Sequence, residues 1–175
     1  MSVMLSSLSR RGICPNFVTT RGVFTCPYEP PASHWGCAEN KNHHVHVQSP
    51  KARRHPKEPG KKHRGRFQYI RMELCLGDTE EYIKDQPKSL LPVEMSRNLL
   101  FQICFGLFAA QTKFSLKHYD LKLLNVFLQN AANVPGAKPS VTGDVVLRYG
   151  LGSKNFALRM PAENGLIAKL GRFGY

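Results

Sequence analysis

Three side chains that lie close together in the sequence are of types that can do chemistry. Asp120 provides a carboxylate, Lys122 an ammonium group and Asn125 an amide. A carboxylate can accept a proton, an ammonium group can attract an anion, and carboxylate and amide oxygens suit hard cations such as Mg²⁺. The alternative is that Asp120 and Asn125 are ordinary capping and turn residues, because such side chains commonly bond to nearby backbone.

The segment that holds these residues has a recognisable order. It reads His118-Tyr119-Asp120-Leu121-Lys122-Leu123-Leu124-Asn125 and resembles the protein-kinase catalytic loop, His-Arg-Asp-Leu-Lys-x-x-Asn. The resemblance implies that Asp120 receives the proton of a substrate hydroxyl, that Lys122 reaches the transferred phosphate and that Asn125 holds a magnesium ion. It therefore predicts ATP-dependent phosphoryl transfer to protein serine or threonine hydroxyls, with ATP and Mg²⁺ as cofactors.

Two upstream segments extend the resemblance. Residues 71–78 (Arg-Met-Glu-Leu-Cys-Leu-Gly-Asp) are similar to the hinge between the two kinase lobes. Backbone groups around Leu74–Cys75 would then bind adenine and Asp78 would lie near the ribose, so Glu73, Cys75 and Asp78 are the predicted nucleotide-binding residues. Residues 12–18 resemble the junction after the kinase regulatory helix, and their sequence is most similar to that of kinases of large DNA viruses. This predicts a host-cell location, cytoplasmic or nuclear.

The sequence also departs from the kinase pattern. It contains no Gly-x-Gly-x-x-Gly loop and no Val-Ala-Ile-Lys-like strand, and Tyr119 replaces the usual arginine. In Lys169-Leu170-Gly171-Arg172-Phe173-Gly174, Arg172 stands where the metal-binding aspartate of Asp-Phe-Gly belongs, and a guanidinium cannot ligate Mg²⁺. We therefore expect a truncated domain that is incomplete or inactive alone. The alternatives are a pseudokinase-like module that binds a protein partner and a basic nucleic-acid-binding protein.

The hydrophobic pattern predicts an α+β fold, a partial kinase-like arrangement with strands before residue 78 and a mainly helical part after it. The predicted domains are residues 1–28 as a remnant of the kinase N-lobe, residues 29–66 as an insertion, and residues 67–175 as hinge, long helix and catalytic loop. The expected strands are 16–24, 67–74 and 166–170, and the expected helices are 79–83 and about 93–112. Because apolar residues surround nearly the whole second helix, we expect it to be buried.

Basic residues are concentrated in one part of the chain. Residues 41–66 contain nine Lys or Arg and one acidic residue, which makes +8 of the net charge of +13. Together with its prolines and histidines, this composition predicts that the 29–66 insertion is disordered. A contact of residues 41–66 with nucleic acid is the alternative function of this segment. A zinc site made from His43, His44, His46, Cys26 and Cys37 is disfavoured, because their spacing matches no common zinc motif.

The five cysteines (14, 26, 37, 75 and 104) are odd in number and irregular in spacing, so we expect reduced thiols and an intracellular protein. The N-terminus does not have the order of a signal peptide. The longest apolar run, residues 99–110, is about half the length of a membrane span. These observations predict a protein without a membrane segment.

Overall fold

The computed structural model describes residues 1–26, 67–133 and 143–171. The chain divides into two compact units. The larger unit combines residues 1–21 with the chain from Met72 onward, and the smaller unit runs from Gly22 to Arg71. The predictions of a disordered 29–66 insertion, of a nucleic-acid contact and of the Arg172 position concern residues outside the described part.

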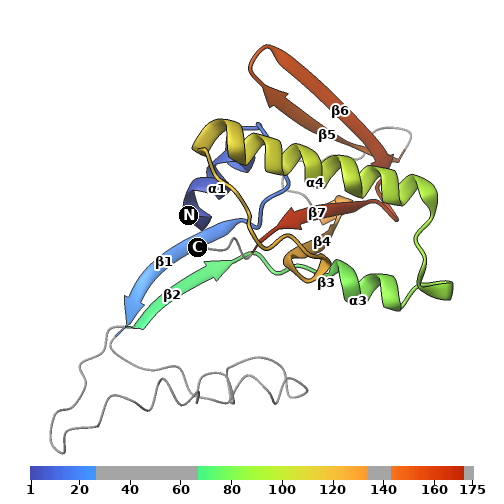
Figure 1. Cartoon of the computed structure of the whole chain (residues 1–175), viewed down its shortest axis with the longest axis horizontal. Coiled ribbons are helices and arrows are strands. Elements are labelled where there is room, and N and C mark those ends of the chain that lie inside the picture. Colours follow the sequence, from blue (N-terminus) through green and yellow to red (C-terminus); the bar gives the residue numbers. More distant parts are fainter. Residues whose placement is uncertain (27–66, 134–142, 172–175) are drawn as a thin grey trace, which may run out of the picture. The chain divides into compact units, whose positions relative to one another are not determined.

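The smaller unit contains most of a two-stranded sheet formed by β1 (Thr20–Cys26) and β2 (Phe67–Met72). The arrows of the two strands run in opposite directions in Figure 1. The rings of Phe24 and Tyr69 stack across the strands with their centroids 5.2 Å apart, an aromatic pair of the kind that stabilises neighbouring strands. Both strands were predicted, at 16–24 from apolar residues near turn formers and at 67–74 from β-prone residues, although β1 begins later than expected.

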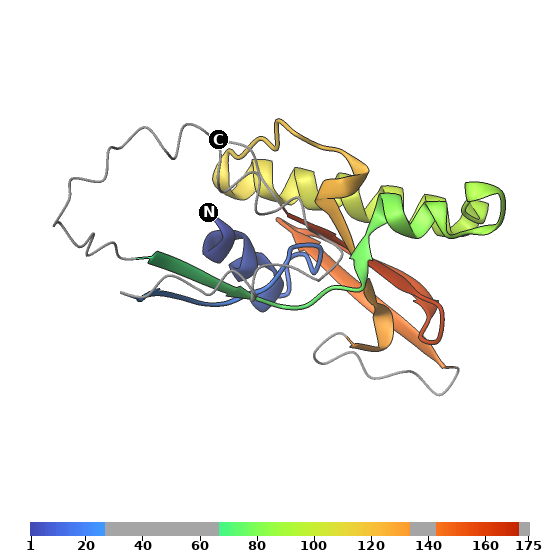
Figure 2. The same ribbon diagram turned by 90° about the horizontal axis from the view of Figure 1, so that it is seen from below.

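The larger unit is a mixed α+β assembly of helices and short antiparallel strands, which confirms the predicted α+β class. Its helices are α1 (Ser2–Arg10), α3 (Thr79–Lys84) and α4 (Val93–Phe114). Its strands are β3 (Gly77–Asp78), β4 (Val126–Asn130), β5 (Asp144–Leu151), β6 (Lys154–Pro161) and β7 (Leu166–Leu170). Figure 1 and Figure 2 show α4 spanning this unit, with the β5–β6 hairpin and the β4–β7 pair along it.

Strand β7 lies at the centre of the larger unit. It pairs antiparallel with β4 over its whole length, from Val126 opposite Leu170 to Asn130 opposite Leu166, and β4 pairs in turn with β3. All five residues of β7 are buried. A strand that is buried on both faces is apolar at nearly all positions, and β7 departs from this only at Lys169, so it could be predicted from the sequence.

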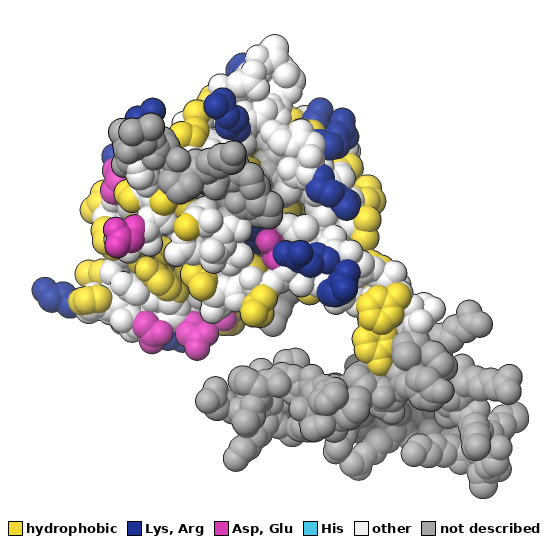
Figure 3. Space-filling model, turned by 180° about the vertical axis from the view of Figure 1, so that it is seen from behind, with side chains coloured by type: hydrophobic (Ala, Val, Ile, Leu, Met, Phe, Trp, Pro, Cys, Tyr) yellow, Lys and Arg dark blue, Asp and Glu magenta, His cyan; other side chains and the backbone are white. Residues whose placement is uncertain are grey.

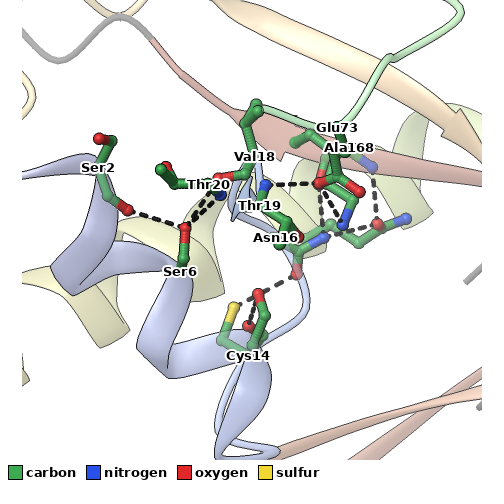
Figure 4. Close-up of polar contacts among 12 residues, drawn as sticks. Ser2, Ser6, Cys14, Asn16, Val18, Thr19, Thr20, Glu73 and Ala168 are labelled. Carbon is green, nitrogen blue, oxygen red and sulfur yellow. Dashed lines mark hydrogen bonds and ion pairs between the residues drawn. The ribbon is translucent and has the colours of Figure 1, made fainter. Parts of the chain in front are cut away.

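The second edge of β7 is covered by side chains and by the segment after α1. Gln102 of α4 donates to the Leu166 carbonyl (2.9 Å) and accepts from the Ala168 amide (2.9 Å), and Asn16 donates to the Ala168 carbonyl (2.8 Å). Asn16 also donates to Gln102, and Figure 4 labels Asn16 and Ala168 among these polar contacts. Because buried backbone groups must be paired, these two amides complete the hydrogen bonding of the strand.

Helix α4 begins after Pro92 and ends at Ser115, whose φ of 52° is in the left-handed region that terminates helices. Gly106 allows the close approach of α4 to β7, since a Cβ there would lie 2.7 Å from Cδ1 of Leu170. The helix was predicted within two residues at its C-terminal end, but the expectation that it is buried all round is wrong. Leu100 and Phe108 are 63% and 54% exposed, because the covering elements reach only one side of the helix.

The β5–β6 hairpin packs on α4 through aromatic rings. Tyr149 of β5 lies against Phe101 and Phe105 with centroid distances of 5.2 and 4.9 Å, and Phe156 of β6 lies 5.8 Å from Phe105. The sequence reading expected an apolar cluster at 145–149 but not its partner β6. The strands β4, β5 and β6 therefore occur where a mainly helical part was expected, whereas β7 was expected as a strand.

Among the described residues, no helix combines the length and the apolar character that a bilayer crossing requires. The face shown in Figure 3 carries a group of acidic side chains over α3, with Lys and Arg side chains distributed over other parts of the surface. The acidic residues at the start of α3 are Glu80 and Glu81, and Asp78 caps the helix by accepting from the Glu81 amide at 2.9 Å. Acidic residues in a first turn favour a helix start, which made α3 predictable from the sequence.

Candidate functional site

A cavity of about 450 Å³ lies beside the segment that joins β2 to β3. Its lining comes from four stretches of the larger unit that are far apart in the sequence. These are Val18 after α1, residues 72–81, Phe127 of β4, and Gly171 directly after β7. All three predicted nucleotide-binding residues, Glu73, Cys75 and Asp78, line this cavity.

Glu73 is fixed in the wall of the cavity by a buried ion pair. Its Oε1 lies 3.1 Å from Nζ of Lys169 in β7, and the two side chains are 7% and 4% exposed. The Thr19 amide donates to the same carboxylate at 2.7 Å, and the Glu73 amide donates back to the Thr19 carbonyl at 2.9 Å. Figure 4 shows the Thr19–Glu73 contact. Removal of two charges from water is costly, so this geometry must hold both partners closely to offset the cost.

The backbone next to Glu73 is open to a ligand. Within the described part of the chain, no hydrogen bond engages the backbone N–H or C=O of Leu74 or Cys75. The side chain of Leu74 is 90% exposed, and Cys75 is half-buried. Free donors and acceptors at the edge of a largely apolar cavity are what a planar heterocyclic ligand requires for orientation.

The thiol of Cys75 is held in its protonated form. Burial raises the pKa of Cys75, the neighbouring Glu73 carboxylate raises it further, and the Lys169 ammonium opposes them with a smaller effect. A protonated thiol is a poor nucleophile. Cys75 therefore lines the cavity and is not a reactive group at neutral pH. Its alkylation can report whether the cavity is occupied.

Asp78 has a structural role that the sequence reading did not give it. The carboxylate that was expected near a ribose accepts the Glu81 amide and so begins α3, although it also lines the cavity. A capping carboxylate has further lone pairs, so the cap and a contact with a hydroxyl ligand are compatible.

The loop after α4 brings Asp120, Lys122 and Asn125 together. Nζ of Lys122 lies 3.1 Å from Oδ2 of Asp120, and Nδ2 of Asn125 donates to the same oxygen at 2.9 Å. Asn125 also donates to the Asp120 carbonyl at 2.8 Å. The Lys122 contact, and then that of Asn125, lower the pKa of the Asp120 carboxyl. Asp120 is therefore ionised at neutral pH and available as a proton acceptor.

The geometry of this loop depends on one strained residue and on an attachment to β7. Tyr119 has a φ of 60°, which is uncommon for a large residue and reverses the chain between His118 and Asp120. His118 contacts the Gly171 carbonyl through Nε2 at 3.0 Å, and the Gly171 amide donates to the Asn125 carbonyl at 3.1 Å. Because Gly171 also lines the cavity, it joins the loop to the cavity.

One oxygen at the loop fits a cation. Asn125 is 1% exposed, and its Oδ1 is buried without a hydrogen-bond partner among the described residues. Such an orphaned acceptor is unusual and suits a hard cation. The Asp120 carboxylate is the second oxygen donor of the loop. Two protein oxygens match the way Mg²⁺ is usually held beside phosphates, with few protein ligands. No group of three or more His, Cys, Asp or Glu side chains that could hold a metal occurs in the described part.

The structure thus gathers the six predicted site residues in two adjoining groups, Asp120, Lys122 and Asn125 in the loop and Glu73, Cys75 and Asp78 at the cavity. The sequence reading missed Lys169, Thr19 and Gly171, which hold these groups in place. Lys169 did give a signal, because a charged residue inside an apolar strand requires a buried partner. Arg172 lies outside the described residues.

Comparison with known proteins found no match among family models, curated proteins or solved structures.

Proposed function

We propose that this chain is a protein-kinase-like domain of the serine/threonine type that accepts ATP in the 450 Å³ cavity. The observation that carries the proposal is the position of Gly171, which connects the cavity to the loop that holds Asp120. This residue lines the cavity, contacts His118 and donates to Asn125. A nucleotide whose base lies against Leu74–Cys75 would have its phosphates directed toward the loop that holds Asp120.

Each residue of the loop has a task in this proposal. Asp120, whose pKa is lowered by Lys122 and Asn125, would accept the proton of a serine or threonine hydroxyl. Lys122 would turn from Asp120 toward the transferred phosphate, which is possible because its side chain is 51% exposed. The free Oδ1 of Asn125 would hold Mg²⁺, which supplies charge neutralisation at the phosphates when bound.

The rate expected for the 175-residue chain alone is very low. The sequence contains no glycine-rich phosphate loop and no matching strand lysine, and it has Arg172 at the metal-binding position. Phosphoryl transfer depends on positioning and charge stabilisation, and loss of one such donor elsewhere lowers a rate roughly a hundredfold or more. A second candidate function, a pseudokinase-like interaction module, is favoured by these same absences.

Alkylation of Cys75 tests nucleotide binding directly. We expect MgATP to slow the labelling of Cys75 at alkaline pH in a mass-spectrometric time course, because Cys75 lines the cavity. Cys104 is exposed on α4 and serves as the internal control that should not respond. Labelling of Cys75 that is unaffected by millimolar MgATP would contradict the proposed nucleotide site.

A phosphate-transfer assay on the purified chain separates the two candidates. We expect no turnover above background, with weak binding of MgATP. Robust transfer that an Asp120→Asn variant abolishes would show an active kinase and would remove the interaction-module reading. Transfer that survives Asp120→Asn would exclude Asp120 as the proton acceptor.

A further inference from the structure

A second concave surface lies between α4 and the turn of the β5–β6 hairpin. It is a groove of about 520 Å³, and none of the described residues that line it belongs to the proposed nucleotide site. Its floor and walls are apolar, and the side chains that the argument uses are Phe105, Phe108, Leu151 and Phe156, with Lys113 and Lys154.

The apolar walls are held in a fixed arrangement and are nevertheless open. Phe105 is buried and lies edge-on to Phe108 (6.3 Å) and to Phe156 (5.8 Å). Phe108 and Phe156 are 54% and 45% exposed. The exposed apolar row continues along α4 through Cys104 to Leu100, at the i−4 spacing of one helix face. Rigid aromatic rings that remain exposed next to a groove are typical of a binding surface.

The charges at the groove have one sign. Lys113 comes from α4 and Lys154 from the hairpin, both are exposed, and neither has an acidic partner within the described part of the chain. None of the lining residues is acidic. Since complementary charge guides the choice of partner, this rim favours an anionic occupant.

We propose that this groove binds an acidic amphipathic helix of a partner protein. Apolar residues on one face of that helix would contact Phe108 and Phe156, and acidic residues beside them would contact Lys113 and Lys154. A second copy of this chain is a poorer occupant, because a two-fold interface would place the same lysines against each other. The proposal is independent of whether ATP binds the cavity at Glu73.

Fluorescence anisotropy with two designed peptides tests the inference on the full chain. Each peptide is a helix about 14 residues long, which spans roughly four turns, with leucine at i, i+4 and i+7. One peptide carries glutamate beside these leucines and the other carries lysine. We expect the glutamate peptide to bind about tenfold more tightly, with an advantage that falls as salt is raised.

Charge reversal provides the decisive variant. Lys113→Glu combined with Lys154→Glu should weaken the glutamate peptide about tenfold and strengthen the lysine peptide, a gain that misfolding cannot produce. The matched control is Arg11→Glu combined with Lys88→Glu, which makes the same change in net charge at exposed positions outside the groove. This control should leave the preference between the peptides intact. A Phe108→Ser variant should weaken both peptides.

Three results would overturn the proposal. The first is a control variant that loses the glutamate peptide as completely as the groove variant does, which would indicate attraction by net charge alone. The second is a dimer in sedimentation experiments that Phe108→Ser dissociates, which would make the groove a self-interface. The third is binding to vesicles of anionic lipid that the glutamate peptide does not compete with and that the groove variant abolishes.

Discussion

Two carboxylate–lysine contacts in the larger unit have the same length and opposite environments. The Glu73–Lys169 contact is 3.1 Å long, and its side chains are 7% and 4% exposed. The Asp120–Lys122 contact is also 3.1 Å long, and its side chains are 53% and 51% exposed. The comparison shows that distance alone does not give a pair its role. Burial makes the first pair a structural connection, whereas water around the second leaves both groups free to exchange partners.

The largest effect should come from breaking the buried pair. Lys169→Met leaves the Glu73 carboxylate buried with the Thr19 amide as its remaining partner, and we expect a loss of about 3–5 kcal/mol in the free energy of unfolding. The double variant Glu73→Leu/Lys169→Met should recover much of this loss, because no unpaired charge remains. Urea unfolding followed by circular dichroism measures both. A single variant as stable as the original chain would mean that the pair is not buried in solution.

An intermediate effect on stability is expected at Asn125, which is itself buried but donates to the exposed Asp120. Asn125→Ala removes two hydrogen bonds to Asp120, so we expect a loss of roughly 1–3 kcal/mol in unfolding free energy. The same change removes the free Oδ1, so the affinity for ATP should depend less strongly on Mg²⁺. Calorimetric titration with and without Mg²⁺ checks this point. An unchanged Mg²⁺ dependence would exclude Asn125 as a metal ligand.

The smallest effect on stability is expected at the exposed pair. Asp120→Asn should lower the urea midpoint only slightly at neutral pH, because solvent and salt screen the contact with Lys122. The pH dependence has a definite sign. Lys122 and Asn125 lower the pKa of Asp120 in the folded chain. Its contribution to stability is therefore present above the unfolded pKa of about 4 and is lost as the pH falls through the lower folded value.

An acid titration of the unfolding midpoint for the original chain and for Asp120→Asn would measure that difference. The original chain should be slightly more stable than Asp120→Asn at neutral pH, and the two curves should converge as the pH falls below about 4. If Asp120→Asn lowers stability at neutral pH as strongly as Lys169→Met does, the distinction between the two pairs is wrong.

The elements that could be predicted from the sequence are those with a local signal. The helix α4 follows a proline and has a regular apolar spacing, α3 has acidic residues in its first turn, and β7 is apolar at every position except Lys169. Asp120, Lys122 and Asn125 could be selected from the sequence because they lie within eight positions of one another, so a short-range pattern contains all of them. In contrast, β6 was missed. Most of its residues are exposed, and buried residues do not alternate with exposed ones along the strand.

The sequence by itself determined which chemical groups this protein can bring to a site and the order in which they occur. Only the tertiary structure decided that Gly171 joins the loop to the cavity, that Lys169 is paired with Glu73, and that one side of α4 is left uncovered. The physical reason is that these contacts join residues far apart in the sequence, and their energies depend on burial. A pattern of neighbouring residues specifies the helix but not the element that packs on it.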